Sequence, residues 1–219
     1  EKYAMHVKKM EIAAQDGRAQ KSMGLAHVTS NRGADHLYAF PVLDEVGFEK
    51  EIAERFGEQY LPEMTDRLNP KYKGIMVAEL EDFCAVVEAV GVCKYGTVIP
   101  PVFFYPDLAR ALTLTTGKEY TEADLRLIGR RIVTLQRLFN VREGITRKDD
   151  TLPERFTKEP MPRGPAKGQV VELDIMLDEY YSYRKWDLET GIPKKETLRE
   201  LGLEREVEEL ERRGITIPP

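Results

Sequence analysis

The sequence has only two cysteines and lacks an excess of basic residues. Its 219 residues carry 33 lysines and arginines against 38 aspartates and glutamates, which gives a net charge of −5. A nucleic-acid-binding protein usually needs a positive excess to displace counterions, so this class of function is disfavoured. Cys84 and Cys93 form neither a disulfide framework nor a complete all-cysteine metal site. We therefore expect a reducing compartment, the cytoplasm, and metal ligands from outside this segment for any metal centre.

Long apolar runs and the common cofactor motifs are also missing. No stretch approaches the ~18–20 apolar residues that span a bilayer, so no membrane association is expected. The phosphate-binding G-x-x-x-x-G-K-S/T, the dinucleotide-binding G-x-G-x-x-G, the zinc-binding H-E-x-x-H and the redox C-x-x-C motifs do not occur. The sequence begins at Glu1 without a methionine or a signal-peptide pattern, which suggests a piece excised from a longer protein.

Helical periodicity dominates the second half of the chain. Thr121 and Asp124 have the spacing of a capping box, and an amphipathic helix of about five turns is predicted to follow. Its arginines, among them Arg137, are expected mostly off the apolar face, which contains Leu125, Ile128, Ile132, Leu135, Leu138 and Phe139. The same periodicity predicts a helix at 172–184 and a charged one at 194–213.

The first half is less regular. Helices are predicted at 48–60, 74–90 and 107–115, and Gly91 stands in a helix-stop position after the second. Residues 97–99 are β-like but have no evident pairing partner, and the proline-rich stretch 153–168 is typical of an extended connector. The sequence therefore predicts a mostly α fold, with residues 1–219 forming one irregular helical domain.

A polar segment at 29–36 is the first place where chemistry is expected. It holds a glycine and several hydrogen-bonding side chains, and it ends at His36, whose imidazole is suited to proton transfer near neutral pH. The alternative is a structural turn in which the histidine is satisfied by a backbone carbonyl.

A carboxylate and a thiol flank a helix end at 88–94. Because a helix C-terminus carries partial negative charge, a thiolate at Cys93 would need a nearby cation, which a metal or a cluster would supply. The alternative is that Cys93 is a small buried apolar residue. Cys84, on the apolar face of the predicted helix, is expected in the core. A third polar region, 139–144 followed by 149–156, is either a structural helix end or part of a channel wall.

A series of short segments along nearly the whole chain is recognisable. They are Tyr3-Ala4-Met5-His6-Val7-Lys8, Glu11-Ile12, Met23-Gly24-Leu25-Ala26, 29–36, Gly91-Val92-Cys93-Lys94-Tyr95, 116–121, 128–132, 138–147, 149–156, 177–181 and Gly191-Ile192-Pro193. In these segments, taken in this order, the chain resembles the C-terminal, largely helical region of the tungsten-dependent aldehyde:ferredoxin oxidoreductase family.

The resemblance implies two cofactors, a tungsten or molybdenum bis-pterin and a [4Fe–4S] cluster. Cys93 matches the fourth cluster ligand, and Glu88 matches an acidic position that contacts a pterin. Val92 and Lys94 flank the cluster ligand and are assigned to cofactor binding, as is Tyr38. A separate expectation concerns His36, which matches a histidine near the metal that is a candidate for catalytic proton transfer.

Some family features differ here. Glu88 stands in place of an aspartate, Val92 in place of a leucine, and Tyr38 where a basic, pterin-contacting residue is common. The other cluster cysteines and the first pterin-binding domain are not in this sequence, so both cofactors are expected to be shared with upstream domains.

By this resemblance, the chain is part of an enzyme that oxidises aldehydes to carboxylic acids. Electrons would pass through the cluster to ferredoxin or another electron-transfer protein, and a homo-oligomer is a further expectation. An aromatic acyl-CoA reductase of the same family is one alternative. The other is a non-catalytic helical module that serves as a scaffold or a subunit interface, which the charged segment 194–213 would suit.

Overall fold

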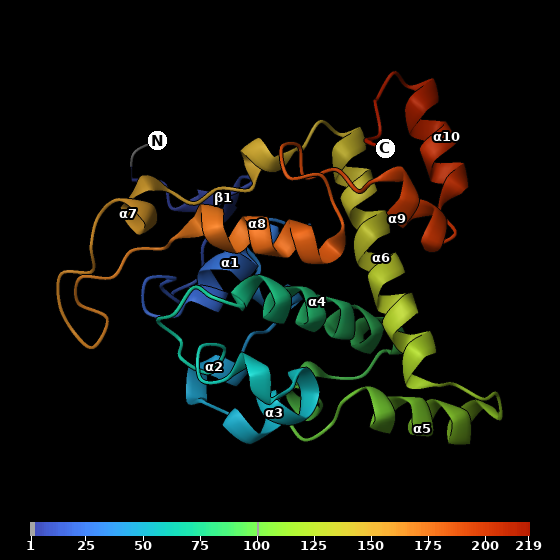
Figure 1. Cartoon of the computed structure of the whole chain (residues 1–219), viewed down its shortest axis with the longest axis horizontal. Coiled ribbons are helices and arrows are strands. Elements are labelled where there is room, and N and C mark those ends of the chain that lie inside the picture. The colour runs from blue at the N-terminus through green and yellow to red at the C-terminus, as the bar shows by residue number, and fades with distance from the viewer. Residues whose placement is uncertain (1–2, 100) are drawn as a thin grey trace.

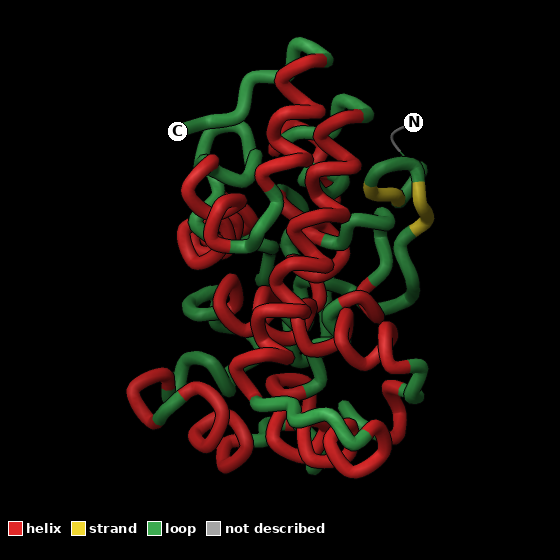
Figure 2. The backbone as a smooth tube through the Cα atoms, turned by 90° about the vertical axis from the view of Figure 1, so that its right-hand side faces the viewer, coloured by secondary structure: helices red, strands yellow, loops and turns green. Residues whose placement is uncertain are grey.

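The computed structural model describes residues 3–99 and 101–219 and confirms the mostly helical fold. The described residues form ten α-helices, four short 3-10 helices and one antiparallel hairpin (Figure 1, Figure 2). None of the described helices is long and apolar enough to cross a bilayer. The elements in chain order are β1 His6–Val7, β2 Met10–Glu11, α1 Lys21–Thr29, η1 His36–Tyr38, α2 Leu43–Val46, α3 Glu49–Phe56, η2 Glu58–Tyr60, α4 Lys73–Val90, η3 Lys94–Gly96, α5 Tyr105–Thr116, α6 Glu122–Arg142, η4 Arg147–Asp149, α7 Glu154–Thr157, α8 Leu173–Arg184, α9 Lys195–Glu200 and α10 Glu204–Arg212.

Helix α4 lies at the centre of the fold and packs against α1, α6 and α8 (Figure 1). Two glycines permit these close approaches. A Cβ added to Gly74 would lie 2.5 Å from the backbone nitrogen of Tyr180 on α8, and one on Gly129 of α6 would overlap the carbonyl oxygen of Asp82. Because the opposing atoms belong to the backbone, a side-chain rotation cannot make room for a methyl group.

A buried ion-pair network joins α4 to α8. The Arg184 guanidinium lies 2.7 Å from the Glu81 carboxylate and 3.0 Å from that of Asp82. Burial raises the pKa of Asp82 to about 7, although Arg184 opposes the shift. The hydroxyls of Thr29 on α1 and Tyr180 on α8 donate hydrogen bonds to Glu81 at 2.6 and 2.5 Å. Glu81 therefore links α4 to both α1 and α8.

Helix α6 confirms the predicted capping box but not the predicted buried face. The Asp124 amide donates to the Thr121 hydroxyl at 3.2 Å, and the Thr121 amide donates to the Asp124 carboxylate at 2.8 Å. Of the apolar residues predicted on one buried face, three are exposed: Ile128, Leu135 and Phe139.

The buried face of α6 instead contains Gly129, where this helix meets α4, and Arg137. Arg137 was predicted off the buried face, yet it is 1% exposed. Its guanidinium lies 2.8 Å from the carboxylate of Asp150, which follows η4, and the Lys8 ammonium lies 2.7 Å from the same carboxylate. A charged side chain can be buried when a partner of opposite charge faces it, and hydropathy periodicity does not detect such a partner.

The other predicted elements are largely confirmed, with three differences. The predicted helix 194–213 is two helices, because Gly202 between α9 and α10 adopts a φ of +66°, which breaks the helix. The predicted helix 48–60 ends as an α-helix at Phe56 and continues as η2. Helix α1 and the small hairpin were not predicted. The connector 153–168 is confirmed, with the short α7 inside it.

Candidate functional site

Helix α4 ends in a hydrogen-bonded bend that leads directly into the predicted cluster-ligand segment. The Gly91 amide donates to the carbonyls of Val87 and Glu88 at 3.1 Å, and the Val92 amide donates to Val87 at 3.2 Å. This is the Schellman pattern, which needs a left-handed residue and explains the glycine, whose φ is +82°. The bend turns the chain out of the helix before Cys93.

The backbone of Cys93 is fixed while its thiol is exposed. Its carbonyl accepts hydrogen bonds from the Gly96 amide at 3.0 Å and from the Thr97 hydroxyl at 3.3 Å. Cys93 and the neighbouring Val92 are both exposed. The alternative of a buried apolar cysteine therefore does not hold for Cys93. Below, residues 91–96 are called the Cys93 loop.

Cys84 shows the contrasting environment that was expected of it. Its side chain is fully buried on α4, and its thiol donates a hydrogen bond to the Ala39 carbonyl at 3.4 Å. Burial raises the pKa of this thiol to about 12. Of the two cysteines, only Cys93 is therefore placed to bind something outside the chain.

Glu88 and Lys94 form an ion pair beside the Cys93 loop. The Lys94 ammonium lies 2.5 Å from one Glu88 carboxylate oxygen, and the exposed fractions of the two side chains are 14% and 51%. The lysine also donates a hydrogen bond to the carbonyl of Leu37. The ammonium is thus already engaged within the chain, whereas much of the Glu88 carboxylate is open to an external hydrogen-bond donor.

His36 opens the 3-10 helix η1, which is called the His36 turn below. Asp35 caps this turn by accepting a hydrogen bond from the Leu37 amide at 3.1 Å, and the His36 carbonyl accepts from the Phe40 amide at 2.7 Å. The imidazole is half-buried, and burial lowers its pKa below the usual value. A neutral imidazole that can accept a proton is favoured at neutral pH.

The imidazole of His27, on α1, packs edge-on against that of His36. Their ring centroids are 5.2 Å apart and their planes are inclined by 75°. Both ring nitrogens of His27 are buried without a hydrogen-bond partner among the described residues. Burial lowers the pKa of His27 to about 4. No local pattern in the sequence indicates this contact.

Tyr38 closes the His36 turn and lines a pocket of about 450 Å³. The pocket is also lined by Arg32, Leu135, Gln136 and Phe139, and by the asparagines Asn31 and Asn140. The Tyr38 side chain is partly buried, which raises the pKa of its hydroxyl above the usual value, and the charge of Glu88 adds to this shift. The hydroxyl therefore remains protonated at neutral pH.

Polar segments predicted at 29–36 and 139–144 meet at this pocket. The Asn140 amide donates to the Asn31 carbonyl at 2.7 Å, and the Asn31 amide donates to the Val133 carbonyl at 3.2 Å. The pairing of the two segments agrees with a wall role for the second one. Gln136 was missed because it lies among other polar residues, Thr134, Arg137 and Asn140, and no local pattern singles it out.

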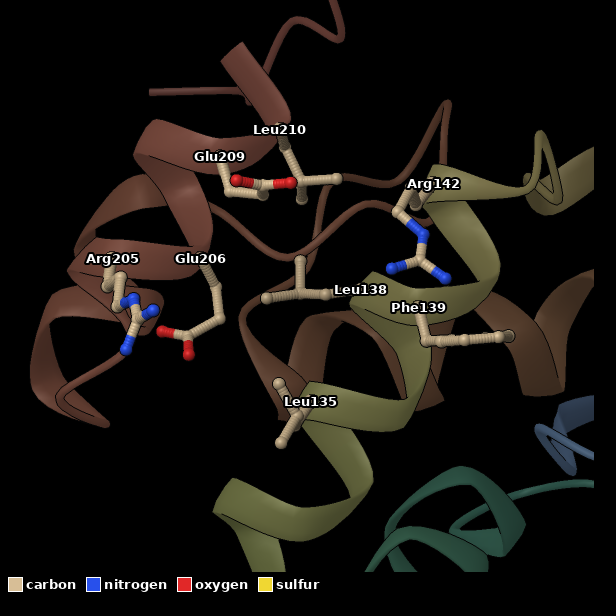
Figure 3. Close-up of a pocket in the computed structure, with 8 residues that line it drawn as sticks. All are labelled: Leu135, Leu138, Phe139, Arg142, Arg205, Glu206, Glu209 and Leu210. Carbon is tan, nitrogen blue, oxygen red and sulfur yellow. The ribbon is translucent and has the colours of Figure 1, made fainter. Parts of the chain in front are cut away.

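A second pocket, of about 550 Å³, lies between α6 and α10 (Figure 3). Its α6 side is formed by Leu135, Leu138, Phe139 and Arg142, and its α10 side by charged residues with Leu210. The six residues predicted for the site are not among those that line it.

The described residues do not form a complete metal site. No group of three or more histidine, cysteine, aspartate or glutamate side chains in the described part of the chain is arranged to hold a metal ion. The donor set fits a shared site, because Cys93 presents one accessible thiol on a fixed backbone. Each iron of a [4Fe–4S] cluster takes one cysteine thiolate, so Cys93 could hold one iron while the thiolates for the other three would come from other segments.

The fold and the site define a helical region that presents candidate side chains singly, from separate segments. The family model "Aldehyde ferredoxin oxidoreductase, domains 2 & 3" matches residues 1–203. The chain belongs to the aldehyde ferredoxin oxidoreductase family, a family of oxidoreductases, and corresponds to its C-terminal region.

Curated relatives agree with this assignment. The chain is 38% identical to the tungsten-containing aldehyde ferredoxin oxidoreductase of Pyrococcus horikoshii over 203 residues, which are 92% of this chain and 31% of that protein. It is 36% identical to the enzyme of the same name from Thermococcus kodakarensis, over 92% of this chain and 31% of that protein. The chain therefore spans about a third of the length of these relatives.

A solved structure and a more distant relative match as well. The active site complex BamBC of benzoyl coenzyme A reductase superposes with a TM-score of 0.61 at 27% identity, covering 79% of this chain and 27% of that one. A WOR-like subunit of an aliphatic sulfonate oxidoreductase from Pyrococcus furiosus is 28% identical, over 97% of this chain and 30% of that protein. The proteins to which this chain is similar therefore carry names with different substrates.

Proposed function

We propose that residues 1–219 are the C-terminal helical domain of a tungsten-bispterin oxidoreductase that oxidises aldehydes to carboxylic acids. The observation that carries the proposal is the exposed Cys93 thiol on a hydrogen-bonded bend, in a chain of this family. The names of the tungsten-containing relatives support the choice of metal and substrate. Molybdenum is the alternative metal.

Five residues would hold the shared cofactors. The Cys93 thiolate would be one ligand of a [4Fe–4S] cluster, with Val92 and Lys94 beside it. Glu88 has a carboxylate open to solvent that can accept a hydrogen bond from a pterin amino group, and Tyr38 keeps a protonated hydroxyl that can donate one. When bound, the metal would supply two-electron redox chemistry, and the cluster would supply one-electron transfer toward ferredoxin or another electron-transfer protein.

His36 would handle a proton. Oxidation of a hydrated aldehyde to a carboxylic acid releases protons as well as electrons, so a base beside the substrate is useful. The His36 imidazole is favoured in its neutral form, because burial lowers its pKa, and one of its ring nitrogens can accept the proton. We assign His36 as the catalytic residue on this basis.

A second candidate function is the reduction of an aromatic acyl-CoA thioester. The similarity to the benzoyl coenzyme A reductase complex favours it, as does Tyr38 in a position where the family commonly has a basic residue. The same cofactors and the same residues would serve both reactions, so the site residues do not separate them.

Assays of the intact protein would separate these functions. Aldehyde oxidation coupled to the reduction of an oxidised ferredoxin-type carrier supports the first proposal, and activity on aromatic thioesters alone supports the second. If the purified protein contains no tungsten, molybdenum or iron, a helical scaffold is favoured instead. Fractionation of cells would test the proposed cytoplasmic location. Light scattering on the purified protein would test the expected homo-oligomer.

A further inference from the structure

Three predicted site segments meet at the ammonium group of Lys94. The Nζ atom contacts Glu88 in the last turn of α4 and Leu37 in the His36 turn, which is 57 residues away along the chain. Lys94 itself begins η3, directly after Cys93. One side chain therefore connects the end of α4, the Cys93 loop and the His36 turn.

The lysine is the inward-facing member of an otherwise exposed loop. Residues 88–93 and 95–96 are all exposed, whereas only 14% of the Lys94 side chain is accessible. Its charge is well placed, because Glu88 lies at a helix C-terminus, where a negative side chain is unfavourable. The carbonyl of Leu37 gives the ammonium a second, fixed acceptor.

These contacts contribute more to geometry than to stability. An ion pair with a half-exposed carboxylate contributes little to the stability of the fold. The hydrogen bonds of the Cys93 loop and of the His36 turn are otherwise local. A further contact is the edge-on packing of the Tyr95 ring, in the loop, against Phe40, two residues after the turn, at 5.3 Å between ring centroids. Removing the ammonium should leave the fold intact and loosen one segment relative to the other.

We propose that Lys94 is a positioning residue that fixes the His36 turn relative to the Cys93 loop. In the proposed function, on which this inference rests, the proton-accepting imidazole and the cluster ligand belong to these two segments. Lys94 would then keep the proton-transfer group and the electron-transfer centre in a constant relative position, without touching the substrate itself.

The test measures the distance between the two segments directly, without any cofactor. A nitroxide attached to Cys93 in the 219-residue chain broadens the NMR signals of nearby imidazole protons. Cys84 does not compete for the label because it is fully buried and its thiol pKa is about 12. The chain has only three histidines, so the His36 signal can be assigned by its loss in His36→Gln.

Lys94→Met keeps the length of the side chain and removes the donors. We expect the relaxation enhancement at His36 to fall by about half or more, because the enhancement depends steeply on distance and the two segments separate. Lys94→Arg, which can still reach both acceptors, should restore it. The matched control is Lys50→Met, which removes an exposed lysine whose ion pair with Glu54 lies on α3, and it should leave the value unchanged.

An unchanged relaxation enhancement in folded Lys94→Met, or an equal loss in Lys50→Met, would overturn the positioning role. If Lys94→Met does not fold, Lys94→Ser decides in its place, since its short side chain reaches neither of the two acceptors. There too, an unchanged value overturns the role. The result is independent of the proposed function: the link can exist in a chain whose Cys93 binds no cluster, and a cluster can bind where no link exists.

Discussion

Acidification should destabilise this chain through His27. The pKa of His27 is about 4 in the folded chain, against the 6.5 of an unperturbed histidine. The unfolded chain therefore binds more protons than the folded chain between these two values, and the free energy of unfolding falls as the pH falls through this window. The full difference corresponds to ~3 kcal/mol, of which ~2 kcal/mol is already lost at pH 5.

The variant His27→Leu isolates this contribution. It replaces two buried ring nitrogens, neither of which has a partner among the described residues, with an apolar side chain of similar size. Urea unfolding at pH 7.5 and pH 5 should show that the stability lost on acidification is smaller in His27→Leu than in the wild type, by about 2 kcal/mol. His6→Leu is the control, because His6 is exposed on the hairpin.

An equal loss in His27→Leu and in the wild type would refute this reasoning. Carboxylates with lowered pKa values, such as Asp150, also cost stability in acid, but only at lower pH and equally in both chains. The difference between the two chains at pH 5 is therefore the decisive quantity.

Three further changes test the fold and the site. Gly129→Ala should lower the free energy of unfolding in urea by ~1–3 kcal/mol, because its methyl group would meet the α4 backbone. Gly96→Ala, which has open space around it, should change stability little. Equal effects of the two variants would contradict the close packing. Arg184→Met leaves two buried carboxylates without their ion-pair partner and should lower the free energy of unfolding by ~3–5 kcal/mol. Arg213→Met, which removes an exposed ion pair, should lower it by less than ~1 kcal/mol. A similarly small effect of Arg184→Met would refute the network. His36→Gln in the intact protein should lower turnover by about 10²-fold or more with unchanged tungsten and iron content, and unaltered turnover would remove His36 from the mechanism.

The sequence predicted those elements whose determinants are local. Helix α6 was found from its capping box, and the end of α4 from Gly91, because each depends on residues a few positions apart. Helix α1 was missed because it is buried on all sides and so has no polar face to create a periodicity. The burial of Arg137 was missed because its partner, Asp150, comes from a separate element.

The candidate site shows the same division. Cys93, Glu88 and His36 could be identified from the resemblance, and the bend before Cys93 from Gly91. The edge-on contact of His27 with His36 and the bond from Lys94 to Leu37 could not, because each joins residues whose approach depends on how α1, α4 and the His36 turn pack together.

The central claim is that Cys93 supplies a thiolate to an iron–sulfur cluster in the intact protein. The most direct test is electron paramagnetic resonance of the reduced intact protein carrying Cys93→Ala, with iron analysis of the same sample and Cys84→Ala as the buried control. The account predicts that the cluster signal is altered or lost in Cys93→Ala and is retained in Cys84→Ala. A spectrum and an iron content unchanged by Cys93→Ala would contradict it.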